Sequence, residues 1–240
     1  MSALRKVYMG RFVGRCLALL AVTLGLHFLP GQFVILQPGR FLERPSLLHI
    51  LWLVWIADMV SQLIPLKSGI MALGSQKVFR RHFRYAEAAA AQLQSNFREM
   101  TRRAYRVFGT WAVLIAALGI LHAKRVLGNL GLLWISVFFY VCDLICVLFW
   151  CPFRQFFMKN RCCTTCRIFN WDHLMMFTPL LFVPGFFARS LVIMAVVVFL
   201  LWELTAFCHP ERFWEGTNDA LKCINCTDLL CIHAKKIHGK

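Results

Sequence analysis

The stretch Asn129–Trp150, NLGLLWISVFFYVCDLICVLFW, decides the fold class of this chain. It is 22 residues long, and Asp143 is its only charged residue. Coiled as an α-helix it would be about 33 Å long, which is enough to cross the roughly 30 Å hydrocarbon core of a membrane. The sequence therefore predicts a transmembrane helix at this position.

The composition of the whole chain agrees with this prediction. Hydrophobic residues make up 59% of the 240 residues and charged residues only 16%, and the mean hydropathy is +0.62. Soluble domains average about 45–50% apolar and about 25% charged residues. These values exclude an ordinary soluble globular protein, a disordered chain and a disulfide-stapled miniprotein. We expect an all-α polytopic transmembrane helix bundle.

Five further apolar stretches are long enough, or nearly so, to cross a membrane: Phe12–Leu29, Ser46–Pro65, Val107–Ala123, His173–Phe187 and Ser190–Cys208. The first is an uncleaved span, because no small-residue cleavage site follows it. Its Arg15 is expected to snorkel to the headgroups. The stretch that starts at His173 has only 15 residues and contains Pro179 and Pro184, so it is either a short kinked span or a re-entrant loop.

These spans divide the chain into three transmembrane hairpins and three polar segments. The hairpins are 1–65, 107–150 and 173–208, and between and after them lie an amphipathic helix in 66–106, a Cys-rich loop 151–172 and a Cys-rich tail 209–240. Of the 27 Lys and Arg residues, 22 fall on the side that carries the polar segments and five on the other. Cytoplasmic loops retain such an excess, so we expect six spans in an inner membrane with both termini in the cytoplasm. Membrane topology accounts for the charge of +16, and we expect no nucleic-acid partner.

A seven-residue period marks segment 66–106. Apolar residues recur there at alternating steps of four and three: Phe79, Phe83, Ala86, Ala90, Leu93, Phe97, Met100 and Ala104. This spacing predicts one amphipathic helix over Gln76–Arg106, continuous with the following span or kinked into it. Its cations Lys77, Arg80, Arg81 and Arg84 suit an anionic membrane surface. The alternative use of the stripe is a coiled-coil contact with a partner.

Eleven cysteines all fall in the cytoplasmic half of the expected topology. Because the cytoplasm is reducing, metal ligation or redox chemistry is favoured there over disulfides. Cys163 and Cys166 form one C-x-x-C pair, and Cys223 and Cys226 form a second. The last hairpin separates the two pairs and returns the chain to the same side. We therefore expect the four thiols to converge on zinc or on an iron–sulfur cluster.

Further cysteines lie beside these pairs, and Cys151, Cys162 and Cys231 are possible extra ligands. Redox dithiols, palmitoylated thiols and incidental thiols remain the alternatives, and Cys142, Cys146 and Cys208 suit apolar packing. The run CVLFWCPF from Cys146 resembles the span-ending C-x-x-x-C-P motif of membrane-bound polyferredoxin subunits of nitrate and nitrous-oxide reduction, with one residue more between the cysteines. The resemblance implies electron transfer. His173 and His209 are alternative ligands at the membrane surface.

Three acids, Asp58, Asp143 and Glu203, lie within spans at similar depths, about 8–10 Å from the cytoplasmic boundary. Acids in hydrocarbon are costly and usually face the bundle interior. They form either a cluster that can pass protons or cations, or separate pairs with a nearby Arg or His.

Motifs of soluble enzymes, such as the Walker A or G-x-S-x-G sequences, are absent. The leading hypothesis is an inner-membrane electron-transfer protein that works with a membrane redox partner or quinone. The alternatives are a transport or metal-handling protein, and a structural protein with a zinc staple.

Overall fold

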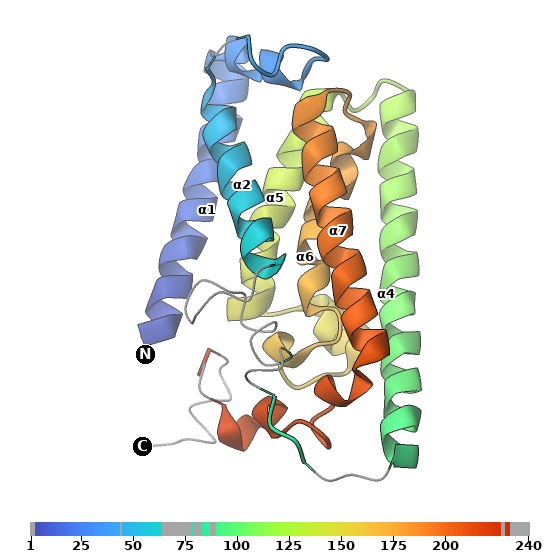
Figure 1. Cartoon of the computed structure of the whole chain (residues 1–240). Helices are drawn as coiled ribbons and strands as arrows, with labels where there is room; N and C mark the ends of the chain where they lie inside the picture. The colour runs from blue at the N-terminus through green and yellow to red at the C-terminus, as the bar shows by residue number, and fades with distance from the viewer. Residues whose placement is uncertain are drawn as a thin grey trace.

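The protein folds as a bundle of long helices that lie side by side (Figure 1). The computed structural model describes residues 3–43, 45–63, 78, 83–86, 90–226 and 229–230. Its long helices are α1 (Ala3–Phe28), α2 (Leu47–Leu63), α4 (Ala90–Ala123), α5 (Asn129–Leu148) and α7 (Phe186–Cys208). In the part of the chain that is described, no β-strand forms, and extended backbone pairs only at an isolated bridge between Tyr85 and Asn218. The predicted all-α class is confirmed.

Among the described residues, four helices are long and apolar enough to cross a membrane: α1, α4, α5 and α7. They overlap the spans predicted at Phe12–Leu29, Val107–Ala123, Asn129–Trp150 and Ser190–Cys208. Helix α1 begins nine residues sooner and ends one residue earlier than predicted, and α5 ends two residues earlier. Helix α2 matches the second predicted span but is only 17 residues long. Many outward side chains of the bundle are apolar and exposed, as a bilayer solvent requires.

The segment predicted as the fifth span is not one regular helix. It forms the short α6 (Asp172–Phe177), which continues as the 3₁₀ helix η5 (Thr178–Phe182). Pro179 lacks the N–H that the α-helix would need at this point, so the α-helix gives way to a tighter turn. The chain then turns at Gly185, which has φ 110° and whose Cβ, if present, would lie 3.0 Å from the carbonyl oxygen of Leu36. A glycine is needed there both for the left-handed backbone and for the close approach.

The amphipathic helix begins later than the sequence predicts. Residues 83–86 are extended, because the Ala86 N–H donates to the carbonyl oxygen of Thr217 and the Asp219 N–H donates to that of Arg84. The prediction of a helix through 83–86 is therefore wrong, while Lys77, Phe79, Arg80 and Arg81 lie outside the described residues. From Ala90 onward α4 continues without a break into the apolar part, and its 34 residues reach about 51 Å. Its polar half extends beyond the bundle (Figure 1).

A continuous apolar core joins the helices. Trp55 of α2 is fully buried, and its ring contacts Tyr140 of α5, Phe177 of α6 and Phe187 of α7 at centroid distances of 5.0–6.4 Å. Such aromatic pairs add about 0.5–1.5 kcal/mol each to the burial of their area. A second cluster lies between the polar half of α4, the end of α7 and the loop after α5. Phe97, Met100 and Ala104 of the predicted stripe pack into it, so the stripe faces the protein's own bundle.

The start of α1, the ends of α5 and α7, and the tail after α7 lie at one end of the bundle, together with the polar half of α4 (Figure 1). We call this the basic end. The α4–α5 connection and the start of α7 lie at the opposite end.

Candidate functional site

The cysteine loop that follows α5 is a short, folded segment. Helix α5 ends at Leu148, and Pro152 opens the next helical turn, η2 (Phe153–Met158). Lys159 then adopts a left-handed conformation with φ 50°, which reverses the chain and leads it to the 3₁₀ turn η3 (Cys163–Thr165). The reversal returns Cys163 to the end of α5, where its thiol donates a hydrogen bond of 3.1 Å to the carbonyl oxygen of Cys146.

A buried ion pair anchors this loop to α7. The Arg167 guanidinium donates two hydrogen bonds of 2.7 Å to the two carboxylate oxygens of Glu203, and the indole N–H of Trp171 donates a third at 2.8 Å. The Arg167 side chain has no exposed surface, and its carbonyl oxygen accepts a hydrogen bond of 2.7 Å from Trp202. Arg167 directly follows Cys166, so the pair fixes the position of the C-x-x-C turn.

Three thiols come together at the end of α5. The Cys151 thiol interacts with the thiols of Cys146 and Cys163, and the backbone N–H of Arg154 donates to its sulfur at 3.3 Å. We call Cys146, Cys151 and Cys163 the thiol cluster. Cys151 is 8% exposed, whereas Cys146 and Cys163 are half-buried. No disulfide joins any of the ten cysteines that the structure describes.

The hydrogen bonds of the cluster favour one ionised thiol. The thiol of Cys146, then that of Cys163, and the N–H groups of Arg154 and Phe153 hold the pKa of Cys151 well below its ordinary value. The same contact with Cys151, together with burial, raises the pKa of Cys163. Burial raises the pKa of the neighbouring Cys166 to about 12. The thiolate, which is the reactive form of cysteine, is therefore localised on Cys151.

The four thiols predicted to converge lie in two separate settings. Cys163 and Cys166 flank η3 beside α5, whereas Cys223 and Cys226 flank η8 (Cys223–Asn225) in the tail, next to η7 (Asp219–Leu221). Among the residues that the structure describes, no group of three or more His, Cys, Asp or Glu is arranged to hold a metal ion. Cys162 contacts the Thr164 hydroxyl at 3.2 Å, and Cys231 lies outside the described residues.

Two of the three predicted intramembrane acids share one basic partner. Arg15 of α1 contacts Asp143 of α5 at 2.5 Å and Asp58 of α2 at 3.9 Å, and its guanidinium stacks over the Tyr140 ring at 3.9 Å. The Arg15 side chain is only 12% exposed. The guanidinium thus lies against carboxylates of two neighbouring helices. Glu203 belongs to the separate pair with Arg167.

His173 extends this group of charges into α6. Its ring is 1% exposed, its Nε2 lies 3.3 Å from Asp58, and its Nδ1 lies 3.1 Å from both Asp172 and the side-chain amide of Gln62. Its described partners are thus carboxylates and an amide, and no thiol is among them. We call Arg15, Asp58, Asp143, Asp172 and His173 the charge network. The sequence pointed to Asp58 and Asp143 by their position within spans. It did not indicate that Asp172 belongs to the network or that Arg167 is the partner of Glu203.

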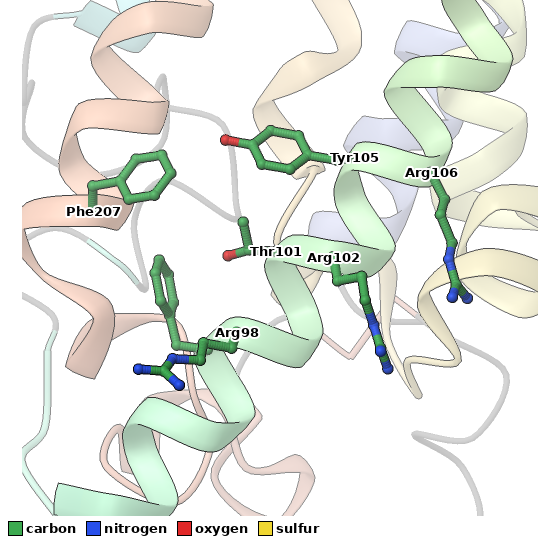
Figure 2. Close-up of a pocket in the computed structure, with 7 residues that line it drawn as sticks. Arg98, Thr101, Arg102, Tyr105, Arg106 and Phe207 are labelled. Atoms are coloured by element: carbon green, nitrogen blue, oxygen red, sulfur yellow. The ribbon is translucent and has the colours of Figure 1, made fainter.

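A shallow hollow of about 560 Å³ lies on the polar half of α4 beside the end of α7. Figure 2 shows Tyr105 and Thr101 of α4 on the side that faces Phe207 of α7, while Arg102 and Arg106 point away from Phe207. Arg98, Arg102 and Arg106 recur every four residues, and no carboxylate among the described residues pairs with them. They form a basic stripe that suits anionic headgroups.

Comparison of the chain with family models, curated proteins and solved structures yields no match.

Proposed function

We propose that this chain is an integral protein of an inner membrane that transfers electrons through the thiol cluster Cys146–Cys151–Cys163. The gathering of these cysteines at the end of α5 supports the proposal: the Cys163 thiol donates to the Cys146 carbonyl oxygen at 3.1 Å, and the Cys151 thiol interacts with both other thiols. Neighbouring thiols of this kind can form a disulfide when their geometry allows it. A thiolate on Cys151 is also the species that attacks a partner disulfide.

The orientation follows from the charges. The polar half of α4, the cysteine loop and the tail all lie at the basic end, and the sequence places 22 of its 27 cations on that side. The positive-inside rule assigns this end to the cytoplasm, with both termini there and six crossings of the membrane. In this arrangement α6 and η5 together make the fifth crossing.

The electron transfer is a two-electron thiol–disulfide couple. Oxidation of the Cys151 thiolate and one partner thiol forms one S–S bond and releases two electrons and one proton. The acceptor is a disulfide of a cytoplasmic protein or a membrane quinone, and a cytoplasmic dithiol of lower potential restores the reduced form. The reducing environment of the cytoplasm makes such cycling more suitable than a permanent structural disulfide.

A redox titration tests this function. Detergent-purified protein is equilibrated in glutathione buffers of graded potential, and its free thiols are then counted by maleimide mass-tagging. We expect the loss of two thiols in one two-electron step, located at Cys151 and one partner by peptide mapping. Cys151→Ser should abolish the step, and Cys208→Ser, at the exposed end of α7, should leave it unchanged. A step that survives in Cys151→Ser would contradict the proposal.

A second candidate function is the binding of zinc or an iron–sulfur cluster by Cys163, Cys166, Cys223 and Cys226. The observation that favours it is that both C-x-x-C turns lie at the basic end (Figure 1). The described residues of the two turns do not form a metal site. No electron-transfer step is therefore assigned to these four cysteines.

Metal analysis of protein purified without oxygen distinguishes the two candidates. A four-thiolate centre would give one zinc, or iron with visible absorbance, and Cys226→Ser would remove it and make the tail sensitive to protease. Cys16→Ser would do neither. The absence of stoichiometric metal would leave the thiol couple as the function.

A further inference from the structure

An apolar groove of about 1070 Å³ lies between α1 and α2, with η1 (Pro30–Leu36) at one end and α5 behind it. Figure 1 shows that α1 and α2 are joined by η1 and diverge toward the basic end. The lining begins at Arg11 and continues to Leu29 along α1, a distance of about 27 Å. Most of it is aliphatic, and it includes the small residues Gly14 and Ala18.

Apart from Gln32 at the η1 end, the polar groups of the groove lie at its basic end. Arg15, Asp58, Ser61 and Tyr140 line it there, and Arg11 stands at the rim. The occupant that fits is therefore a long apolar molecule with one polar head. A groove of this length takes a chain that extends through most of the hydrocarbon core rather than through one leaflet.

The charges at that end favour a neutral head. Arg15 lies between two carboxylates, so its charge is already compensated, and an anionic headgroup placed beside Asp58 and Asp143 would be repelled. One terminal nitrogen of Arg15 donates to Asp143 and to the Tyr140 carbonyl oxygen, while the other lies 3.9 Å from Asp58, too far for a hydrogen bond. This second nitrogen can donate to a carbonyl oxygen in the groove.

The same end of the groove adjoins the thiol cluster. Asp143, which binds Arg15, and Cys146 are three residues apart on α5, or about 4.5 Å along the helix axis. The Cys146 thiol in turn interacts with that of Cys151, which follows the end of the same helix.

We propose that the groove between α1 and α2 binds a lipid-soluble quinone, with its carbonyl head at Arg15 and its apolar tail along α1, and that this quinone is the electron acceptor of the thiol cluster. The redox step rests on the function proposed above. Cys146 and the ionised Cys151 form a disulfide and give up two electrons. The quinone takes these electrons with one proton from Cys146 and one from water at the basic end, and its two carbonyl groups become the hydroxyls of a quinol.

Two glycines of α1 provide a matched test of the site. Gly14 lines the groove, and a Cβ added there would meet nothing within 4 Å, so Gly14→Leu introduces a larger side chain at the groove wall. Gly10 lies about one turn away on the same helix, is equally unobstructed, and does not line the groove. Gly10→Leu therefore controls for the change in helix propensity and hydrophobicity.

The first arm measures binding. Protein purified in mild detergent is extracted with organic solvent, and the extract is analysed by mass spectrometry for quinones and phospholipids, with short-chain quinone titrated back afterwards. We expect quinone to copurify with the wild type and with Gly10→Leu, and Gly14→Leu to bind roughly tenfold more weakly or worse. Phospholipid alone in the extract, or equal quinone affinity in both variants, would overturn the assignment of the groove.

The second arm separates the binding site from the electron-transfer function. Pre-reduced protein is mixed with short-chain quinone, and quinol formation is followed by absorbance. We expect one quinol for each wild-type chain and none for Cys151→Ser, although this variant should bind quinone normally. Normal binding without quinol formation in the wild type would refute the redox step and the proposed function, but leave the binding site intact. Quinol formation that persists in Gly14→Leu would refute the site alone.

Discussion

Arg167 of the cysteine loop and Glu203 of α7 form a two-bond ion pair in which the arginine side chain is completely buried. Desolvation makes such pairs a weak source of net stability, but removal of one partner leaves an uncompensated buried charge that costs about 3–5 kcal/mol. The pair therefore acts mainly as a fixed attachment of the C-x-x-C turn to the bundle.

We accordingly expect Glu203→Gln to lower the free energy of unfolding by about 3–5 kcal/mol and to expose the cysteine loop to protease. Thermal unfolding in detergent and limited proteolysis measure the two effects. Glu43→Gln is the matched control, because Glu43 pairs with Arg40 at 3.8 Å and both side chains are about half exposed. A loss of more than about 1 kcal/mol of unfolding free energy in the Glu43→Gln control would contradict this account. A loss of less than about 1 kcal/mol in Glu203→Gln would contradict it as well.

The Arg15–Asp143 contact predicts a strong coupling between α1 and α5. Arg15→Met leaves Asp143 and Asp58 without their shared cation, so we expect a loss of about 3–5 kcal/mol. Asp143→Asn should also lower the free energy of unfolding. The double variant should lose less than the sum of the two single losses, because it leaves neither the Arg15 nor the Asp143 charge without its partner. A double-mutant cycle by thermal unfolding measures the coupling. Additive losses would show that the two side chains act independently.

The basic stripe on α4 predicts a preference for anionic lipid. Replacing Arg98, Arg102 and Arg106 with Gln removes three charges, each worth about 1 kcal/mol of attraction to an anionic surface. We expect added phosphatidylglycerol to raise the melting temperature of the wild type more than that of the triple variant. Phosphatidylcholine serves as the neutral control and should affect both proteins equally. An equal response of the two proteins to phosphatidylglycerol would contradict the assignment.

Hydropathy and span length were sufficient to predict the class of the fold, because lipid requires each crossing segment to satisfy its own backbone hydrogen bonds. They did not predict the start of α4, because Tyr85 and its neighbours pair with the tail around Asn218, a contact of long sequence separation. The partners of the buried acids escaped prediction for the same reason, since Arg167 and Glu203 are 36 residues apart.

The cysteine sites show the same limit. The C-x-x-C spacing drew attention to Cys163 and Cys166, but it is the reversal at Lys159 that returns Cys163 to Cys146 and Cys151. Pro152, directly after Cys151 and just beyond the end of a span, was the local signal for this turn. A left-handed lysine carries no comparable signal in the sequence.

The alternation of the chain between the two ends of the bundle predicts the membrane topology. Reporter fusions after residues 105, 160 and 240 should all be cytoplasmic, because the polar half of α4, the cysteine loop and the tail lie on the side with 22 of the 27 cations. A fusion after residue 126, in the α4–α5 connection, should read as external. A periplasmic result at 240 with a cytoplasmic one at 160 would mean that the α6–η5 segment does not cross.

The thiol cluster predicts an unusual dependence on pH. Interactions with the thiols of Cys146 and Cys163 and hydrogen bonds from two backbone N–H groups lower the pKa of Cys151, so this thiol stays ionised in the folded protein where a free thiol, with a pKa of about 8.5, is protonated. The stabilisation is complete above the pKa of the unfolded thiol and is lost as the pH falls through the folded value. We expect the ultraviolet absorbance of one thiolate, obtained as wild type minus Cys151→Ser, to persist from about pH 8 to about pH 5. Cys208→Ser, compared with the wild type in the same way, is the control variant. If the absorbance difference between the wild type and Cys151→Ser disappears below about pH 8, the thiolate is not on Cys151. The assignment of Cys151 as the nucleophile would then lose its basis.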